Sequence, residues 1–382
     1  MDEPFKEVFN RPALERMAVA LATAYPRFEA VRFLDLASAG LSDLELKERS
    51  LHISKALKET LPSAFPEVVE IMLSSLGGAY PVDGEIDERN EVGLSGFIVM
   101  PFTDYVMLHG LEHFDLSLAA LKNMTSRFSG EFAIRAFLEG NRDRTLELLS
   151  EWCDHEDKHV RRLVSEGSRP RLPWAPQLKQ FMADPSYTLP FLERLKDDPS
   201  EYVRRSVANH LNDISKDHPD VVADVCAKWL EGASKERVKL VRHALRSNIK
   251  AAHQPTLKAL GYDCEGISVA RPWVQSEPLI YGGALRFGIE LVNDTAASRD
   301  YMLDFIIYHQ KANGKLAPKV FKWRKGKLEA GQMLRVDGKH SIRPITTRKY
   351  YAGEHKVCAL LNGVEHPMGD FELVMETEEL AL

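Results

Sequence analysis

Hydrophobic positions recur at three- and four-residue steps along most of the chain up to about residue 265. The segment from Leu44 to Leu61 shows this spacing and ends at Pro62, and three later segments, Tyr105 to Leu121, Arg144 to Trp152 and Val221 to Leu230, behave in the same way. Such spacing places apolar side chains on one face of a helix and polar side chains on the other. We therefore predict amphipathic helices here and almost no strand before residue 265.

The pattern changes at about residue 270, where apolar and other residues begin to alternate. Leu285 to Leu291 alternates clearly, and Met302 to Tyr308 and Val320 to Trp323 do so more loosely. Alternation is typical of half-buried strands. About seven strands predict an immunoglobulin-like sandwich without a disulfide, because Cys358 alone lies inside it. The dipeptides expected to form turns between strands are Asn293-Asp294, Asn313-Gly314, Lys325-Gly326, Asp337-Gly338 and Asn362-Gly363.

A sequence repeat occurs within the helical part. Asp157 to Val164 aligns with Ser200 to Val207, and Lys235 to Arg242 is a weaker copy. The copies are 43 and then 35 residues apart, which matches helical hairpins of the HEAT type. Such hairpins stack into a curved solenoid with a concave face, although three helices can also share such a pattern by chance. We predict a multidomain chain with a HEAT-like solenoid over residues 1–265 and an all-β immunoglobulin-like sandwich over 270–382.

Composition places the chain among soluble globular proteins. Its 382 residues are 44% hydrophobic and 28% charged, and no apolar run reaches the length of a membrane span. The start of the chain shows no signal peptide, so we expect the cytoplasm and no membrane partner. The cysteines have no CxxC spacing, which argues against structural zinc and against a disulfide scaffold. They are Cys153, Cys226, Cys264 and Cys358.

Charge is distributed unevenly along the chain. The net charge of −6 disfavours a nucleic-acid partner, but Lys311 to Lys356 holds thirteen lysines and arginines against three carboxylates. A local cationic surface attracts phosphates whatever the mean charge. The sandwich residues expected at DNA phosphates are Lys322, Arg324, Lys325, Lys339, Arg343 and Arg348.

The stretch from Val160 to Trp174 combines four arginines, one carboxylate and one tryptophan within fifteen residues. Its first half is typical of an amphipathic helix, and Pro170 and Pro173 make its second half a rigid loop. A basic helix end followed by a stiff basic loop with an aromatic tip suits nucleic acid. Trp174 is a candidate to stack on a base or sugar, and a role as a packing anchor is an equally good interpretation.

The arginines of the repeated helices are candidates to line the concave groove. Guanidinium groups bind phosphates bidentately, which suits DNA. The alternative is pairing within the solenoid, with Asp157, Glu166, Glu201 and Asp213 as partners. The candidate DNA-binding arginines of the helical part are Arg161, Arg162, Arg169, Arg171, Arg204, Arg205 and Arg242.

Three carboxylates, Glu131, Glu166 and Asp213, stand at equivalent ends of successive helical units. A carboxylate in a groove that binds phosphate is unfavourable unless it has a role, such as stabilising a cationic transition state or orienting a water. Cleavage of an N-glycosidic bond passes through a sugar cation of this kind. Taken singly, each of the three is more often a salt-bridge partner than a catalyst.

Two histidine pairs have the spacing of helix-borne metal ligands but no third ligand. His109 and His113 form one pair, and His155 and His159 form the other. No nucleotide-binding or nucleophile motif is present, so we expect neither a metal nor another cofactor.

The string from Val160 to Ala175, VRRLVSEGSRPRLPWA, closely resembles the signature of AlkC-type bacterial DNA alkylation repair glycosylases, which are relatives of AlkD. Phe128 to Phe137 and Tyr202 to Pro219 match the family as well. Together the matches lie between Phe128 and Pro219, and they are long and specific. One departure is Ala136, where the family favours proline.

The resemblance implies a HEAT-like solenoid that holds double-stranded DNA in its concave face and acts at the bacterial nucleoid. It implies excision of 3-methyladenine, 3-methylcytosine and 1-methyladenine in base excision repair. The family's active-site carboxylates correspond to Glu131, Glu166 and Asp213, with Trp174 nearby, and some AlkC proteins carry an immunoglobulin-like C-terminal domain. The family is thought to act without full base flipping, and the sequence agrees weakly because no aromatic-rich pocket motif is evident.

A non-enzymatic scaffold is the alternative function. In that case the HEAT array and the sandwich bind DNA or protein, no base is released, and substitution of the carboxylates is tolerated. Carboxylates embedded among arginines at successive repeats favour the enzyme. We expect a monomer, because solenoids that clamp DNA work as single chains.

Overall fold

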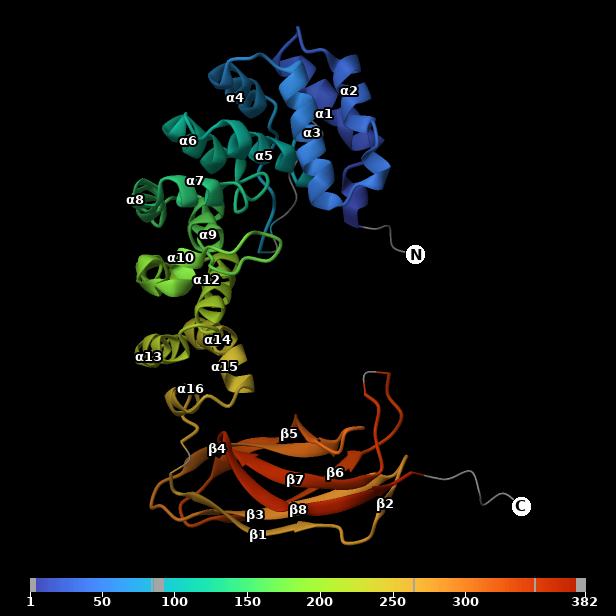
Figure 1. Cartoon of the computed structure of the whole chain (residues 1–382). Coiled ribbons are helices and arrows are strands. Elements are labelled where there is room, and N and C mark those ends of the chain that lie inside the picture. The colour runs from blue at the N-terminus through green and yellow to red at the C-terminus, as the bar shows by residue number, and fades with distance from the viewer. Residues whose placement is uncertain (1–4, 84, 86–92, 264, 347, 376–382) are drawn as a thin grey trace, which may run out of the picture. The chain divides into compact units, whose positions relative to one another are not determined.

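The structure is a computed structural model that describes residues 5–83, 85, 93–263, 265–346 and 348–375 (Figure 1). Helices come first and strands follow, which confirms the predicted fold class. The chain divides into two compact units. We call residues 1–218 and 232–245 the helical unit, and residues 219–231 and 246–382 the sandwich unit.

In its described residues, the helical unit consists of α-helices and four 3₁₀ helices. In chain order these are η1 (Phe5–Val8), α1 (Arg11–Ala24), α2 (Ala30–Ser38), η2 (Leu41–Asp43), α3 (Leu46–Thr60), α4 (Phe65–Ser74), η3 (Phe97–Val99), α5 (Met100–His109), α6 (Phe114–Met124), α7 (Ile134–Gly140), α8 (Arg142–Trp152), α9 (Lys158–Gly167), α10 (Lys179–Ala183), η4 (Pro185–Tyr187), α11 (Leu189–Leu195), α12 (Glu201–Ile214) and α14 (Lys235–Ala244).

The three repeated segments of the sequence are the helices α9, α12 and α14. Helix α9 packs against α12 and α12 packs against α14, so the three follow one another in a row from green to yellow (Figure 1). Val160 and Val203, at equivalent repeat positions, are buried between the helices. Helix α8 packs against α9, and α11 packs against both α9 and α12, which supplies the second layer of the solenoid. The predicted HEAT-like arrangement is therefore confirmed.

Helix α9 has defined ends, and these position the residues that follow it. Asp157 is its N-cap, and its side chain accepts a hydrogen bond of 2.7 Å from the backbone N–H of His159. The helix ends at Gly167, where a β-carbon would lie 2.6 Å from the Ile134 side chain. Pro170 then prevents the chain from resuming a helix. The loop from residue 168 to 178 therefore starts from a fixed point against α7.

One helix prediction is wrong, because Tyr105 to Leu121 forms two helices rather than one. Helix α5 ends at His109 and α6 begins at Phe114. At Gly110 a β-carbon would lie 2.2 Å from the Ser117 hydroxyl oxygen, which itself donates a hydrogen bond of 2.7 Å to the Gly110 carbonyl. This close approach turns the chain where the apolar spacing continues.

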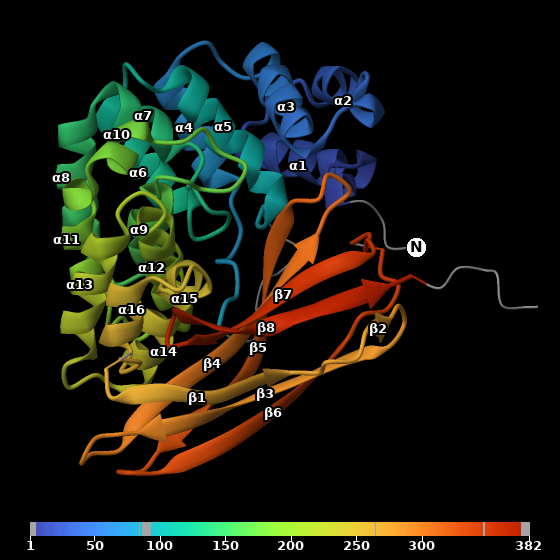
Figure 2. The same ribbon diagram turned by 60° about the horizontal axis from the view of Figure 1, so that its bottom comes forward.

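The sandwich unit contains three short helices and two sheets. A sheet of order β1-β3-β6 faces a sheet of order β2-β8-β7-β4-β5, and the side chains between them form one core (Figure 2). The helices are α13 (Pro219–Leu230), α15 (Arg246–Lys250) and α16 (Gln254–Ala259); the strands are β1 (Ile267–Val274), β2 (Leu279–Ile280), β3 (Ala284–Asn293), β4 (Arg299–Gln310), β5 (Leu316–Leu328), β6 (Met333–Ser341), β7 (Gly353–Leu361) and β8 (Val364–Val374).

Two of the predicted turns are wrong. Lys325-Gly326 lies inside β5 and Asp337-Gly338 lies inside β6. A β-carbon at Gly326 would meet the Tyr301 side chain at 3.0 Å, and one at Gly338 would meet the Phe287 ring at 2.5 Å. These glycines therefore let an aromatic ring approach the backbone within a strand. A dipeptide that ends in glycine looks the same in the sequence whether the glycine forms a turn or makes room for a ring.

The cysteines that the structure describes, Cys153, Cys226 and Cys358, are free and buried, and Cys264 lies outside the described residues. Within the described part of the chain, no helix is both long enough and apolar enough to cross a membrane.

Candidate functional site

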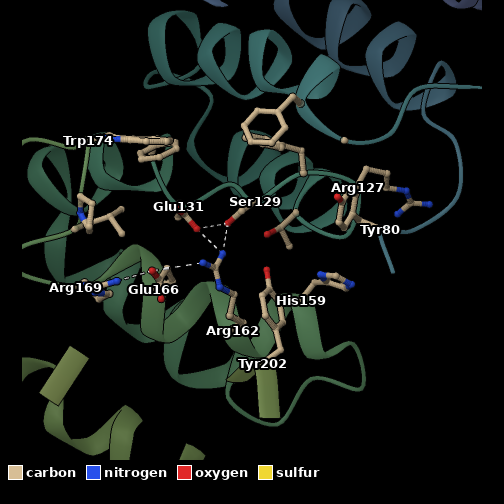
Figure 3. A pocket seen from close by; sticks show the side chains of 17 residues that line it. Tyr80, Arg127, Ser129, Glu131, His159, Arg162, Glu166, Arg169, Trp174 and Tyr202 are labelled. Carbon is tan, nitrogen blue, oxygen red and sulfur yellow. Dashed lines mark hydrogen bonds and ion pairs between the residues drawn. The ribbon is translucent and has the colours of Figure 1, made fainter. Parts of the chain in front are cut away.

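A cavity of about 390 Å³ opens in the helical unit beside α9 (Figure 3). Acidic, basic and aromatic side chains line it together. The lining residues are Tyr80, Gly96, Phe97, Thr125, Arg127, Phe128, Ser129, Glu131, Phe132, His159, Arg162, Glu166, Arg169, Leu172, Pro173, Trp174 and Tyr202.

Glu166 lies in the last turn of α9 and is only 5% exposed. Its Oε1 accepts a hydrogen bond from Arg169 Nη1 at 2.7 Å and lies 3.4 Å from Arg162 Nη2, while Oε2 accepts from the Ser206 hydroxyl at 2.5 Å. Burial raises the pKa of Glu166, but the two guanidinium groups and the hydrogen bonds outweigh burial and lower it below the ordinary value. The site therefore holds Glu166 as a carboxylate with both oxygens oriented.

Glu131 faces the same cavity but has one oxygen without a hydrogen bond. Its Oε2 accepts from the Ser129 hydroxyl at 2.7 Å and from Arg162 Nη1. Among the described residues, Oε1 of Glu131 has no hydrogen-bond partner. Arg162 lies between the two glutamates, as Figure 3 shows, and its guanidinium carbon stacks 4.8 Å from the centroid of the Tyr202 ring.

Asp213 belongs to the same network but does not line the cavity. It lies on α12 and is 2% exposed, and its Oδ2 accepts a hydrogen bond of 2.8 Å from Arg169 Nε. Its other oxygen accepts from Lys216 Nζ at 3.0 Å. The structure thus brings the three predicted carboxylates into one series of alternating charges, in which Arg169 connects Asp213 to Glu166.

Trp174 projects from the loop after α9 at the cavity and is 65% exposed. Its φ of 64° lies in the left-handed region, which is uncommon for a residue with a β-carbon. Its ring lies beside that of Phe5, with centroids 6.4 Å apart. An exposed indole is a poor packing anchor, so the geometry favours the stacking interpretation.

Most candidate arginines of the helical part are paired inside the protein. Arg161 donates to both oxygens of Asp198 at 2.6 and 3.0 Å, and Arg171 pairs with Asp217 at 2.7 Å. Arg204 donates to the carbonyl groups of residues 198 and 199. Arg162 and Arg169 pair with the carboxylates at the cavity. Pairing within the protein, the alternative to phosphate binding, therefore applies to five of the candidate arginines. Their assignment to DNA phosphates stays a prediction, and the two whose side chains are exposed are Arg205 and Arg242.

The candidate cations of the sandwich unit are mostly exposed. Arg348 is the exception, because its Nη1 lies 2.8 Å from His309 Nε2 and its guanidinium lies over the rings of Phe321 and Tyr350. Contact with DNA remains a prediction for all six. The exposed members are Lys322, Arg324, Lys325, Lys339 and Arg343.

The aromatic lining of the cavity was missed from the sequence. The rings of Phe97 and Phe128 lie 5.0 Å apart, and the cavity is also bounded by Tyr80, Phe132 and Tyr202. These residues come from segments spread over more than a hundred positions, so no local motif contains them. The sequence shows no aromatic-rich motif, yet aromatic rings line the cavity. The weak sequence support for excision without full base flipping is therefore lost.

In the described residues, no group of three His, Cys, Asp or Glu side chains is placed to hold a metal ion, at either of the two histidine pairs or elsewhere. His113 stacks on the Phe65 ring, and His159 lines the cavity with its pKa lowered by burial.

Comparison with known proteins agrees with this fold. A family model described as "Uncharacterised protein YhaZ, C-terminal Ig-like domain" matches residues 268–375. Protein YhaZ of Bacillus subtilis is 34% identical over 372 residues, which cover 96% of this chain and 99% of YhaZ. The Pseudomonas fluorescens alkylpurine DNA glycosylase AlkC, bound to DNA containing an abasic site analog, is 35% identical. The match covers 98% of this chain and 99% of the AlkC chain, with a TM-score of 0.77.

Both similarities extend over nearly the whole chain and include the helical unit that holds the cavity. They show that the chain belongs to the AlkC family of DNA alkylation repair proteins.

Proposed function

We propose that the protein is a DNA glycosylase that removes cationic N-alkylated bases, namely 3-methyladenine, 3-methylcytosine and 1-methyladenine, from double-stranded DNA. The observation that carries the proposal is the pair Glu131 and Glu166, held around Arg162 at the cavity. The similarity to AlkC, an alkylpurine DNA glycosylase, supports the same reaction class.

The reaction needs little beyond these carboxylates. The bond between the sugar carbon C1′ and the base nitrogen breaks, and its electron pair neutralises the positive charge of the alkylated base. The leaving base therefore needs no general acid. Positive charge develops on the sugar, and the ionised Glu166 stabilises it electrostatically.

The water oxygen then forms a bond to C1′ and the water gives up one proton, and Glu131 is the residue that we assign to hold this water and to accept that proton. Its Oε1 has no hydrogen bond to the described part of the chain and is available to accept one from water. Both oxygens of Glu166 already accept hydrogen bonds, and Asp213 stands behind Arg169. Asp213 is therefore a positioning residue that acts through Arg169.

Binding to DNA is assigned to two kinds of residue. Trp174 is exposed at the cavity and suits stacking on a base or sugar next to the lesion. Exposed lysines and arginines, above all those of the sandwich, suit phosphate contacts, and binding should weaken steeply with salt.

Excision without full base flipping rests on the family resemblance alone, because the aromatic cavity offers a surface for a flipped base. The fluorescent base 2-aminopurine next to the lesion tests this point. A small change in fluorescence on binding supports a lesion that stays stacked, and a large increase indicates flipping.

The test of the function is incubation with methylated duplex DNA, followed by chromatography of the free bases. We expect release of 3-methyladenine by the unmodified protein, loss of release by Glu166→Gln, and normal release by Glu147→Gln, which makes the same change on the exposed surface of α8. Absence of released base from the unmodified protein would reject the enzyme and favour a DNA-binding scaffold.

A further inference from the structure

Lys47 connects the N-terminal helices to two walls of the cavity without lining it. It lies in the first turn of α3, and its Nζ donates a hydrogen bond of 2.7 Å to the backbone carbonyl of Trp174, which is 127 residues away. The same ammonium group lies 4.9 Å from the centroid of the Phe132 ring. Both partners line the cavity, and Lys47 itself does not.

Trp174 needs such support because its backbone conformation is unfavourable. A left-handed φ in a residue with a β-carbon persists only where the surroundings enforce it. Two hydrogen bonds lie on the peptide after Trp174. Its N–H, that of Ala175, donates to the Leu172 carbonyl at 3.3 Å across the turn that contains Pro173, and its carbonyl accepts the hydrogen bond from Lys47.

The rest of the loop is held from the opposite side. Arg135, which is 4% exposed, donates from Nη1 to the carbonyl groups of Arg169 at 2.7 Å and Gly167 at 3.1 Å. Its Nη2 donates to the carbonyl group of Pro176 at 2.5 Å. Within the described residues, Arg135 thus fixes both ends of the loop, and Lys47 is the only side chain that donates to the carbonyl of Trp174 itself.

We propose that Lys47 is a positioning residue that acts through the Trp174 backbone and holds the indole over the cavity mouth. The catalytic consequence rests on the proposed glycosylase function; the structural consequence, a fixed indole, does not. The ammonium group is engaged by a carbonyl and an aromatic ring, so its role differs from that of an exposed lysine at a phosphate.

The first experiment compares Lys47→Met with Lys47→Arg. Methionine keeps most of the aliphatic side chain but removes the donor and the charge, whereas arginine keeps both. We expect Lys47→Met to slow base release about tenfold and Lys47→Arg to retain at least half of the rate. The matched control is Lys55→Met, which makes the same change at an exposed position of α3 and should leave the rate unchanged.

A double-mutant cycle separates action through Trp174 from a direct contact with DNA. In a Trp174→Ala background, Lys47→Met should change the rate less than twofold, because the residue through which it acts is gone. The salt dependence of DNA binding should be the same with and without Lys47. Independent, additive losses, or a salt slope lower by about 0.9, would overturn the proposal in favour of a phosphate contact.

A fluorescence measurement tests the structural part without DNA or activity. Replacing Trp174 with Phe gives the signal of the other four of the five tryptophans, and subtraction gives the Trp174 component. We expect Lys47→Met to speed the local depolarisation of this component, while Lys55→Met leaves it unchanged. Equal depolarisation in Lys47→Met and the unmodified protein would overturn the proposal. If the unmodified protein releases no base, this measurement still decides the role of Lys47, so the two failures are distinguishable.

Discussion

The sequence presents basic residues in the helical unit and in the sandwich unit as similar candidates for phosphate contacts, but the structure places the two groups in different environments. In the helical unit, Arg161, Arg162 and Arg169 have side chains no more than 15% exposed, and each pairs with a carboxylate. In the sandwich unit, Lys322 and Arg324 on β5 are exposed. The first group therefore organises the interior of a site, and the second leaves its charge available to a phosphate.

The cause of this difference is the supply of nearby carboxylates. Stacked helices place Asp198 next to Arg161, and the turns of α9 place Glu166 four residues after Arg162. Among the described strands, β5 lies at the edge of its sheet and pairs with β4 alone, so no strand pairs with its other side. Exposed charges on such an edge are available to phosphates, and they also prevent the edge from pairing with a strand of another chain.

The largest effect that this comparison predicts is on the rate of base release when a buried carboxylate is neutralised. Glu166→Gln keeps the shape but removes the charge, so we expect base release to slow about a thousandfold. The affinity for duplex DNA that contains an abasic-site analogue should change less than threefold. Single-turnover kinetics and a binding titration measure the two quantities. Asp213→Asn should slow release less than Glu166→Gln, because Asp213 acts through Arg169; the reverse order would contradict the assigned roles.

The next effect is on stability. Arg161→Met leaves Asp198, whose side chain is 3% exposed, without its guanidinium partner, and should lower the free energy of unfolding by about 3 kcal/mol. Arg205→Met is the control, since Arg205 is 66% exposed and its pair with Glu201 lies at the surface; about 0.5 kcal/mol or less is expected. Urea unfolding measures both. Equal losses in the two variants would remove the distinction between paired and exposed arginines.

A smaller effect is expected on DNA affinity from the sandwich. Replacing Lys322, Arg324 and Lys325 together by Ala should weaken binding about tenfold and lower the salt slope by about 2 to 3, because each lost phosphate contact contributes about 0.9. The free energy of unfolding should stay nearly constant. Removal of three exposed lysines from helices, Lys55, Lys179 and Lys228, changes the net charge equally and is the control. Equal losses would show that only total charge matters.

The smallest effect concerns the hydrogen bond between Ser206 and Glu166. Ser206→Ala removes one of the interactions that lower the pKa of Glu166, so that pKa should rise toward its ordinary value. Glu166 then gains a proton at a higher pH, and activity should be lost earlier as the pH falls. A rate loss of about fivefold at neutral pH is expected. Ser206→Thr keeps the hydroxyl and should restore the profile; an acid limb that does not move in Ser206→Ala would contradict this role.

Sequence reasoning identified much of the fold because helix and strand periods are local. The repeats of α9, α12 and α14 were visible as copies of one pattern, and β3, β4 and β5 as alternating runs. Sequence reasoning failed where contact with a distant side chain determines the backbone conformation. Gly110 separates α5 from α6 because of Ser117, and Gly326 stays within a strand because of the Tyr301 ring.

The candidate site divides in the same way. Glu131, Glu166 and Trp174 were identified because they lie in a motif with specific residues, and the structure places all three at the cavity. Lys47 and Ser206 were missed, since nothing near them in the sequence indicates contact with Trp174 or Glu166.

By itself, the sequence determined the helical solenoid, the sandwich after it, and the acidic, basic and aromatic residue types of the candidate site. Tertiary structure alone decided which charges are available. It turned Arg162 inward between two carboxylates, left one oxygen of Glu131 open, placed Asp213 behind Arg169, and gathered aromatic rings from distant segments. The physical reason is that period and propensity act over a few residues, whereas burial and pairing depend on which helices pack together.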